Sequence, residues 1–229
     1  MTSMKKLLIT GTDTDVGKTW VSQLILKQLS ANQFRVGAYK PACSGACLAA
    51  DGTSTWSDVD LLHSAIDLGT KELVCPQTFH AALAPNVAAE LEGSTIDDQL
   101  LRSGCLAWES IADLLLIEGA GGLCCPLSNS TSVADLAQEL AAPIVIVAAN
   151  RLGVINHTLL TVEVARSRGL KIAAVVLNDC LQQVNEDESP SSNHGQLKRL
   201  LSDLEILTCE FNSQRLGGST AVQLASWFA

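Results

Sequence analysis

The sequence of 229 residues predicts an α/β protein: a mostly parallel sheet covered by helices on both faces, in three layers. First, apolar runs typical of strands alternate with amphipathic stretches typical of helices along most of the chain. Second, a glycine-bounded loop joins the first apolar run directly to the first amphipathic stretch. Third, polar or Gly-rich segments follow five successive strand runs, at the edge where such sheets bind ligands.

The periodicity assigns the elements as follows. Strands are expected near residues 5–10, 34–39, 113–117, 143–149, 171–177 and, more weakly, 205–209. Helices are expected over residues 20–29, 88–91, 94–110, 131–140, 196–204 and 219–228. A further helix is expected to begin with Ser57 or Asp58 as its N-cap, and another to run from Asn156 to about Gly169. The segments 45–57 and 185–195 are expected to be loops.

Composition narrows the class of protein. A chain that is 47% hydrophobic, with a mean hydropathy of +0.24, can bury a substantial core, and residues 1–229 fit one domain. No apolar run approaches the ~20 residues that cross a bilayer. The N-terminus lacks a secretory cleavage site, so we expect a cytoplasmic protein without a membrane partner. The formal charge of -9 argues against nucleic acid as a partner.

The eight cysteines do not have the spacing of a metal site. Cys43 and Cys47 have no matching second pair, and Cys124 and Cys125 are adjacent, which is too close for ordinary shared tetrahedral ligation. Reduced, mostly structural thiols are therefore expected rather than a zinc site.

The loop Gly11-Thr12-Asp13-Thr14-Asp15-Val16-Gly17-Lys18-Thr19 predicts a P-loop NTPase-type fold. Its backbone amides would surround the phosphates of ATP, while Lys18 reaches the outer phosphates and Thr19 ligates Mg²⁺. Five residues separate the two glycines, where the general motif has four. Asp13 and Asp15 would face phosphates that repel them. The side chain of Asp15 is expected to bond either to a neighbour or to a metal-bound water.

Two further strand ends carry residues suited to this chemistry. Glu118 closes the run 113–117 and would bind Mg²⁺ directly or through water. The Gly119-Ala120-Gly121-Gly122 segment behind it exposes backbone amides to an anion. Lys40 follows the second strand as the second lysine of this set, and a surface lysine is the less favoured alternative. Asp58 and Asp60 could each be a helix-cap or first-turn charge.

Taken together, these motifs resemble dethiobiotin synthetase. The resemblance rests on the phosphate loop, on Gly37-Ala38-Tyr39-Lys40-Pro41 with Ser44-Gly45, and on Glu118 to Gly122. It extends through Gly153-x-Ile155-Asn156-His157 and Asn178-Asp179, so it covers most of residues 5–180. The longer spacing of the phosphate loop is the spacing that this family uses.

The resemblance implies an ATP-dependent cyclo-ligase of biotin biosynthesis. The family closes a cyclic urea from 7,8-diaminononanoate (7,8-diaminopelargonate), CO2 and ATP, through a carbamate and a carbamic-phosphoric anhydride, and releases ADP and phosphate. Two lysines and Mg²⁺ would stabilise the phosphates and the carbamate, which implies catalytic roles for Lys40 and Lys18. The family also implies a homodimer whose active site is shared between subunits.

The resemblance also implies a set of site residues. Those for ATP are Asp15, Val16, Gly17, Lys18, Thr19, Trp20, Asp58, Glu118, Gly119, Ala120, Gly121, Asn178 (at the adenine) and Asp179. Those for Mg²⁺ are Thr19, Asp58 and Glu118. Those for substrate are Ser44, Gly121, Gly122, Asn156 and His157, the last two at a helix start that receives the substrate carboxylate from the neighbouring subunit. Residues 204–210 contain no proline, whereas the family usually has Ile-Pro there beside the adenine.

Three other classes of protein fit less well. A ParA/MinD-like partitioning ATPase has a signature lysine early in the loop, and Asp13 occupies that place here. Cobyrinate synthetases add a glutaminase domain, for which 229 residues leave no room. A non-catalytic regulatory module of the same fold would be expected to lose Lys18, Lys40 or Glu118. The sequence therefore favours the enzyme.

Overall fold

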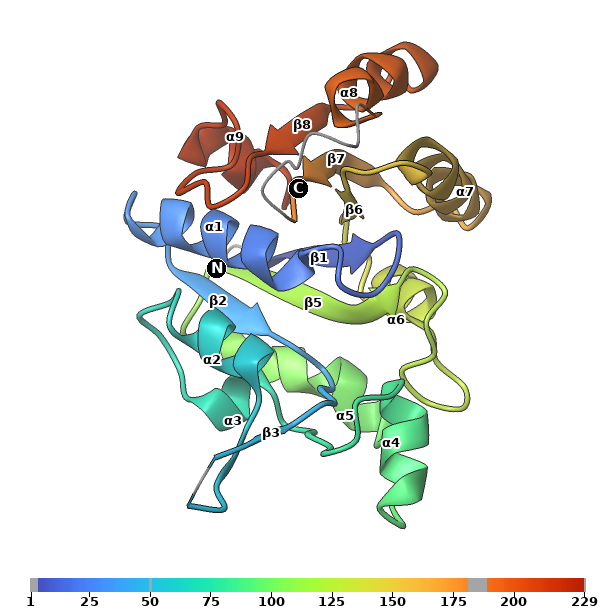
Figure 1. Ribbon diagram of the computed structural model, residues 1–229. Helices are drawn as coiled ribbons and strands as arrows, with labels where there is room; N and C mark the ends of the chain where they lie inside the picture. Colours follow the sequence, from blue (N-terminus) through green and yellow to red (C-terminus); the bar gives the residue numbers. More distant parts are fainter. Residues whose placement is uncertain (1–3, 50, 181–188, 229) are drawn as a thin grey trace.

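A computed structural model describes residues 4–49, 51–180 and 189–228, and its centre is a six-stranded parallel sheet (Figure 1). The strand order is β2-β5-β1-β6-β7-β8. The strands are β1 (Lys5–Gly11), β2 (Val36–Tyr39), β5 (Leu114–Gly122), β6 (Ile144–Ala149), β7 (Ile172–Asn178) and β8 (Ile206–Cys209). The predicted α/β fold with a parallel sheet is confirmed.

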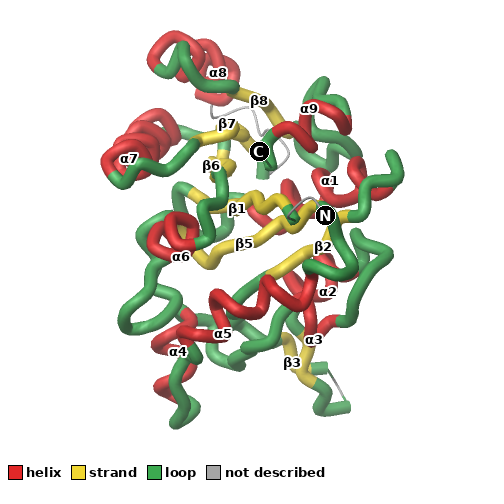
Figure 2. Tube along the Cα trace, turned by 180° about the vertical axis from the view of Figure 1, so that it is seen from behind, coloured by secondary structure: helices red, strands yellow, loops and turns green. Residues whose placement is uncertain are grey.

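Helices cover both faces of this sheet, as Figures 1 and 2 show from opposite sides. Helix α1 contacts α2 and α9 on one face, while α6 packs on β5 and α7 contacts α8 on the other. The helices are α1 (Lys18–Ser30), α2 (Ser57–His63), α3 (Lys71–Val74), α4 (Pro85–Leu91), α5 (Asp98–Ser103), the 3-10 helix η1 (Gly104–Trp108), α6 (Val133–Glu139), α7 (Val154–Ser167), α8 (Ser189–Leu200) and α9 (Ala221–Ser226). Across the described ranges, no helix is long and apolar enough to cross a membrane.

Two predicted segments were wrong. The helix expected from residue 196 begins at Ser189, and the range 189–195, expected as loop, is helical. Its polar Asn193 is buried and donates a hydrogen bond to the side chain of Asn150, which anchors the first turns. Residues 185–188 of that expected loop lie outside the described residues. The segment 45–57 contains a short hairpin of β3 (Cys47–Leu48) and β4 (Ser54–Thr55).

Other helix ends also differ from expectation. The N-cap of α2 is Trp56, so neither Ser57 nor Asp58 is the cap and both lie in the first turn. Helix α7 begins at Val154, two residues before the predicted start at Asn156. The single helix expected over 94–110 is divided into α5 and η1 at Gly104. A Cβ on Gly104 would lie 2.3 Å from the Tyr39 hydroxyl, so this close approach needs glycine.

The central strands β1, β5 and β6 are buried on both faces, which explains their nearly continuous apolar sequences. Their register determines the site. Ile117 of β5 pairs with Tyr39 of β2, so the next residues, Glu118 and Lys40, emerge side by side. Similarly, Ala149 pairs with Asn178 on the other half of the sheet. The carboxyl ends of the strands therefore bring the predicted polar residues to a single edge.

Candidate active site

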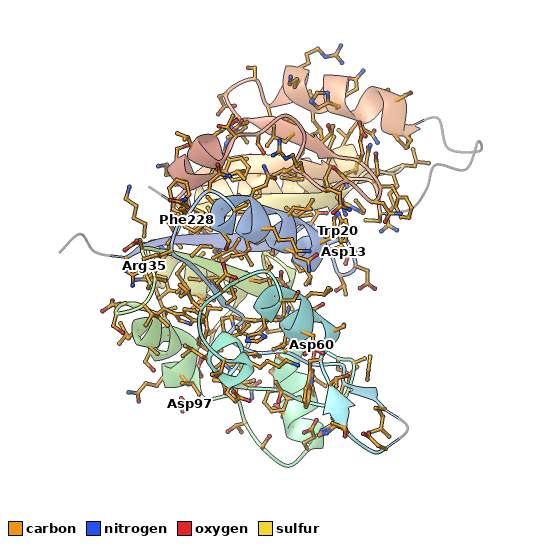
Figure 3. All side chains as sticks on the ribbon, turned by 90° about the vertical axis from the view of Figure 1, so that its left-hand side faces the viewer. Asp13, Trp20, Arg35, Asp60, Asp97 and Phe228 are labelled. Atoms are coloured by element: carbon orange, nitrogen blue, oxygen red, sulfur yellow. The ribbon has the colours of Figure 1, made fainter. Side chains whose placement is uncertain are left out.

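A cleft of about 870 Å³ lies at the carboxyl edge of the sheet. Residues of the phosphate loop line it, and the labels of Asp13 and Trp20 in Figure 3 mark the loop and the start of α1. Its lining residues come from separate parts of the chain: Thr14, Asp15, Gly17, Lys18, Thr19, Trp20, Lys40, Ala42, Cys43, Ser44, Asp58, Ala82, Leu83, Ala84, Pro85, Ala120, Gly121, Cys125, Asn178, Asp179, Cys180, Phe211 and Asn212. Most of the predicted nucleotide residues are among them.

The phosphate loop presents backbone amides to this cleft. Gly17 is the N-cap of α1 and has a left-handed φ of 87°. A Cβ at this position would lie 2.0 Å from Nδ2 of Asn178, so both the conformation and the space require glycine. Gly17 has no side chain with which to cap the helix, and the first turn contains no acidic residue. The first amides of α1 and its positive dipole end therefore suit an anion.

The two acidic residues of the loop have conformational reasons to be there. Oδ1 of Asp13 accepts a hydrogen bond from the amide of Thr14 at 2.7 Å, and the Asp13 carbonyl accepts one from Lys18 Nζ at 3.1 Å. Asp15 has a φ of 56°, in the left-handed region that aspartate and asparagine tolerate better than most residues. The backbone of the loop therefore explains an aspartate at position 15.

Glu118 is the centre of a buried polar cluster. Its side chain is 0% exposed. Its Oε1 accepts hydrogen bonds from Thr19 Oγ1 at 2.9 Å and from Lys40 Nζ at 2.7 Å. Its Oε2 accepts one from Ser22 Oγ at 2.7 Å. Oδ2 of Asp58 lies 2.9 Å from the same Lys40 Nζ. The structure thus brings Thr19 of α1, Asp58 of α2, Lys40 after β2 and Glu118 of β5 together. The strand predicted to end before Glu118 continues to Gly122, so Glu118 lies in the middle of β5.

The cluster keeps Lys40 charged. Burial by itself would lower the pKa of Lys40, but Glu118 and Asp58 outweigh burial and hold that pKa well above its usual range. Burial would likewise raise the pKa of Asp58, yet Lys40 beside it holds the carboxyl below its usual value. The pKa of Lys18 is lowered by burial and by Lys40, with Glu118 opposing the shift. Lys40 is therefore a permanent buried cation next to the phosphate loop.

The oxygen atoms of this cluster fit a magnesium site. Oxygen donors from carboxylates and hydroxyls are the ligands that Mg²⁺ takes. Oε1 of Glu118 and Oδ2 of Asp58 both lie within 2.9 Å of one atom, Lys40 Nζ, and Thr19 Oγ1 bonds to the same Oε1. The cation on which the two carboxylates converge in the structure is the Lys40 ammonium, and the three predicted metal ligands would have to hold Mg²⁺ beside it.

In the run Gly119 to Gly122, some residues pack against neighbouring elements and others line the cleft. A Cβ on Gly119 would lie 2.8 Å from the Val133 side chain of α6, and Gly122 pairs with Gly11 of β1. Only Ala120 and Gly121 of this run line the cleft. Gly121 has a φ of 58°, so the backbone there also adopts the left-handed conformation.

Asn178 and Asp179 lie at one end of the cleft. Asn178 is 3% exposed, and its Nδ2 donates a hydrogen bond to the Val16 carbonyl at 3.1 Å. Its buried Oδ1 has no hydrogen-bond partner among the described residues. Asp179 accepts a hydrogen bond from Asn150 at 2.8 Å. Trp20 lines the same cleft, while Val16 is buried beneath it.

Ser44 lies at the opposite end. Its hydroxyl donates to the Leu83 carbonyl at 2.5 Å, which joins the loop after β2 to residues 82–85. Asn156 and His157 are exposed in the first turn of α7 and are not among the residues lining this cleft. The structure therefore does not bring these two together with the other predicted substrate residues within one chain.

Sequence reasoning missed several residues of the site. Phe211 and Asn212 follow β8, so the rule that ligands bind at strand ends could have found them. Ser22 lies one turn after Thr19, and its helical spacing was the available signal. Cys43, Cys125 and Cys180 line the cleft without a local pattern that indicates it.

Comparisons with known proteins find relatives over most of the chain. A family described as AAA domain matches residues 5–209. The ATP-dependent dethiobiotin synthetase BioD of Anaeromyxobacter sp. is 41% identical over 198 residues, which are 86% of each chain. The enzyme of the same name from Anoxybacillus flavithermus is 41% identical over 186 residues, 81% of this chain and 83% of the relative.

Solved structures resemble the chain in fold alone. Chloroplast FtsY from Physcomitrella patens superposes with a TM-score of 0.54 at 11% identity, over 100% of this chain and 66% of that one. The Cyanothece McdA(D38A)-ATP complex gives a TM-score of 0.51 at 16% identity, over 93% of this chain and 85% of that one. These likenesses support the P-loop NTPase-type fold.

Proposed function

Because this chain belongs to the ATP-dependent dethiobiotin synthetase family, we propose that it forms the ureido ring of dethiobiotin from 7,8-diaminononanoate, CO2 and ATP, with release of ADP and phosphate. It is an ATP-dependent ligase of biotin synthesis. The observation that carries the finer proposal is the convergence of Lys40, Asp58 and Glu118 beside the phosphate loop. A nucleotide-binding module without ligase chemistry would not need a second buried lysine there.

The reaction that we propose has three steps. One amine of the substrate captures CO2 as a carbamate. A carbamate oxygen then attacks the γ-phosphorus of ATP, and the bond to ADP breaks. The second amine attacks the carbonyl carbon of the mixed anhydride, the urea ring closes and phosphate leaves. Charge develops on the carbamate and on the transferred phosphoryl group, so fixed cations are the groups that lower the barrier.

Two lysines would supply these cations. Lys40 projects from the end of β2, lines the cleft and stays protonated, so it would stabilise the carbamate and its phosphorylated form. Lys18 begins α1 beside the amides of the loop, so it would hold the outer phosphates of ATP. Thr19, Asp58 and Glu118 would hold Mg²⁺, which would neutralise charge on the phosphate oxygens.

The residues that line the cleft indicate where along it each ligand would lie. The adenine would lie at the end formed by Asn178 and Asp179, where Phe211 offers an apolar surface. The diaminononanoate would lie at the opposite end beside Ser44, with the amide of Gly121 nearby; Gly122, also predicted for substrate, pairs with Gly11 and does not line the cleft. The triphosphate would then point from the base toward Lys40, which lines the same cleft.

The proposed function is tested by omitting each substrate. Purified protein is assayed for ADP release and for dethiobiotin with ATP, bicarbonate and diaminononanoate, each left out in turn. We expect both products only in the complete mixture, in equal amounts. ADP release that is independent of diaminononanoate would instead identify an ATPase of another class.

We further propose a homodimer that shares its active site. The first turn of α7 carries exposed Asn156 and His157, follows the glycine N-cap Gly153 and contains no acidic residue, which suits a carboxylate. Since these residues lie away from the cleft of their own chain, they would serve the cleft of a second copy. An Asn156→Ala protein mixed with a Lys40→Gln protein should then regain activity in heterodimers. Confirmed heterodimers without any recovery would show that each site is complete within one chain.

A further inference from the structure

Ser22 is a buried hydroxyl that lies beneath the cleft. It is 0% exposed and does not line the cavity, yet its Oγ donates a hydrogen bond of 2.7 Å to Glu118. We propose that Ser22 is a positioning residue that orients the Glu118 carboxylate for the metal ion of the ATP site. The inference rests on the proposed function, since that function supplies the metal.

The two carboxylate oxygens of Glu118 accept hydrogen bonds from different residues. Thr19 and Lys40 both donate to Oε1, and Ser22 donates to Oε2. The carboxylate of a glutamate rotates about the Cγ–Cδ bond unless both of its oxygens are fixed. Hydrogen bonds to Oε1 alone would leave the plane of the carboxylate free to turn. The bond from Ser22 therefore fixes the direction in which Glu118 presents its lone pairs.

The geometry of α1 makes this arrangement possible. Thr19 and Ser22 are three residues apart, so their side chains lie on the same face of the helix. That face packs against β5, where Glu118 is located, and each hydroxyl reaches a different oxygen of the carboxylate. Of the two, only Thr19 lines the cleft and can itself contact a ligand. Ser22 can hold Glu118 in the same way whether or not Thr19 binds metal.

Loss of the hydroxyl should weaken metal binding more than catalysis. Removing an outer-shell partner of a metal ligand typically costs about 10–100-fold in metal affinity. Ser22→Ala should therefore raise the Mg²⁺ concentration for half-maximal activity by roughly this factor. At saturating Mg²⁺ the kcat should recover to near the wild-type value, because Ser22 does not touch the reacting atoms.

Direct metal binding separates this role from a loss of stability. Mn²⁺ is titrated into the protein with ADP present and followed by electron paramagnetic resonance, for wild type, Ser22→Ala and Ser22→Cys. Ser219→Ala is the matched control, because Ser219 is also buried and donates a hydrogen bond of 2.7 Å, but to the Leu216 carbonyl. The Tm of each variant is measured alongside.

We expect the Kd for Mn²⁺ to rise in the order wild type, Ser22→Cys, Ser22→Ala, because a thiol is a weaker donor than a hydroxyl. Ser219→Ala should lower the Tm without changing that Kd. A wild-type Kd in Ser22→Ala, or an equal rise in Ser219→Ala, would overturn the proposal. Mn²⁺ affinity does not depend on diaminononanoate, so a wild type that binds Mn²⁺ but makes no dethiobiotin would refute the proposed function alone.

Discussion

The two ends of the cleft, which we call the phosphate end and the base end, are built from different kinds of residue. The phosphate end consists of charged and hydroxyl groups, most of which bond to one another, and the base end consists of amide, carboxylate, thiol and aromatic groups at or just beyond the ends of β7 and β8. We use phosphate end for Lys18, Thr19, Lys40 and Asp58 with Glu118, which is buried and does not itself line the cleft, and base end for Asn178, Asp179, Cys180, Phe211 and Asn212. Lys40 is 3% exposed and Phe211 is 42% exposed, which summarises the contrast.

This difference separates two ways of contributing to a reaction. Groups at the phosphate end hold one another in place, so a single substitution there disturbs several contacts in a buried, low-dielectric setting. On the proposed function, groups at the base end would contact the part of ATP that does not react, so they would contribute binding energy that is the same before and during the chemical step. Substitutions at the phosphate end should therefore lower kcat, and those at the base end should raise KM.

The largest effect is expected for Lys40→Gln. Loss of this cation should lower kcat by about 10²–10³-fold, the cost of removing one donor from a developing charge. It also leaves the buried Glu118 without its ammonium partner, so the free energy of unfolding should fall by about 3–5 kcal/mol. Steady-state kinetics and chemical denaturation measure the two effects, and calorimetry with an ATP analogue checks that nucleotide still binds. Near-normal turnover would remove Lys40 from the chemistry.

The next effect distinguishes two aspartates of α2. Asp58 faces Lys40 across 2.9 Å, whereas Asp60 pairs with Lys71 on the surface. Exposed pairs of this kind are worth about 0–1 kcal/mol, so Asp60→Asn should leave activity nearly unchanged. Asp58→Asn should raise the Mg²⁺ requirement by roughly 10-fold or more, since one charged oxygen donor is lost. Mg²⁺ titrations of the two variants test this, and equal effects would show that Asp58 does not bind the metal.

A smaller effect is expected at the base end, from Phe211→Ala. Stacking of a base on an aromatic ring is worth about 1–3 kcal/mol. Because Phe211 is partly exposed, we expect the lower end of this range, a rise in the KM for ATP of roughly fivefold with kcat unchanged. Val222→Ala is the control, since Val222 is an exposed apolar residue of α9 away from the cleft. A fall in kcat without a change in KM would contradict the assignment of this end to the base.

The same contrast decides what could be predicted from the sequence. The fold and the phosphate end could be predicted, because hydrophobic periodicity and the spacing between Gly11 and Thr19 are local properties of the chain. Lys40 and Glu118 could be found because parallel strands deliver their carboxyl ends to one edge, and the register of β2 and β5 places the two residues side by side.

Only part of the base end could be predicted in the same way: Asn178 and Asp179 follow a clear strand pattern, whereas Phe211 and Asn212 were missed. Phe211 follows the weakest strand pattern, and its place in the cleft depends on how the loop after β8 folds back. Gly17 reads as a phosphate-loop glycine, but it also makes room for the Asn178 amide from a distant strand. Helix α8 starts early because Asn193 bonds to Asn150, a contact across about forty residues that no local propensity encodes.

The smallest expected effect concerns pH and tests whether the two ends also differ in their contribution to folding. The pKa of Asp58 is lowered in the folded protein although burial opposes this, chiefly by Lys40. A carboxyl with a lowered pKa stabilises the fold above its unfolded pKa of about 3.9, and that contribution is lost as pH falls through the folded value. Lys40 has a raised pKa, so its contribution disappears only in strong alkali.

The free energy of unfolding of Asp58→Asn should therefore differ from that of wild type by a constant amount from about pH 5 to pH 9, and the difference should diminish below about pH 4. Phe211→Ala removes no titratable group, so its difference from wild type should stay constant throughout. Urea denaturation at each pH measures both series. A difference for Asp58→Asn that does not diminish in acid would mean that the carboxylate of Asp58 contributes nothing to folding. The phosphate end would then be a set of charges held in place by the fold, as the base end is held by its loops.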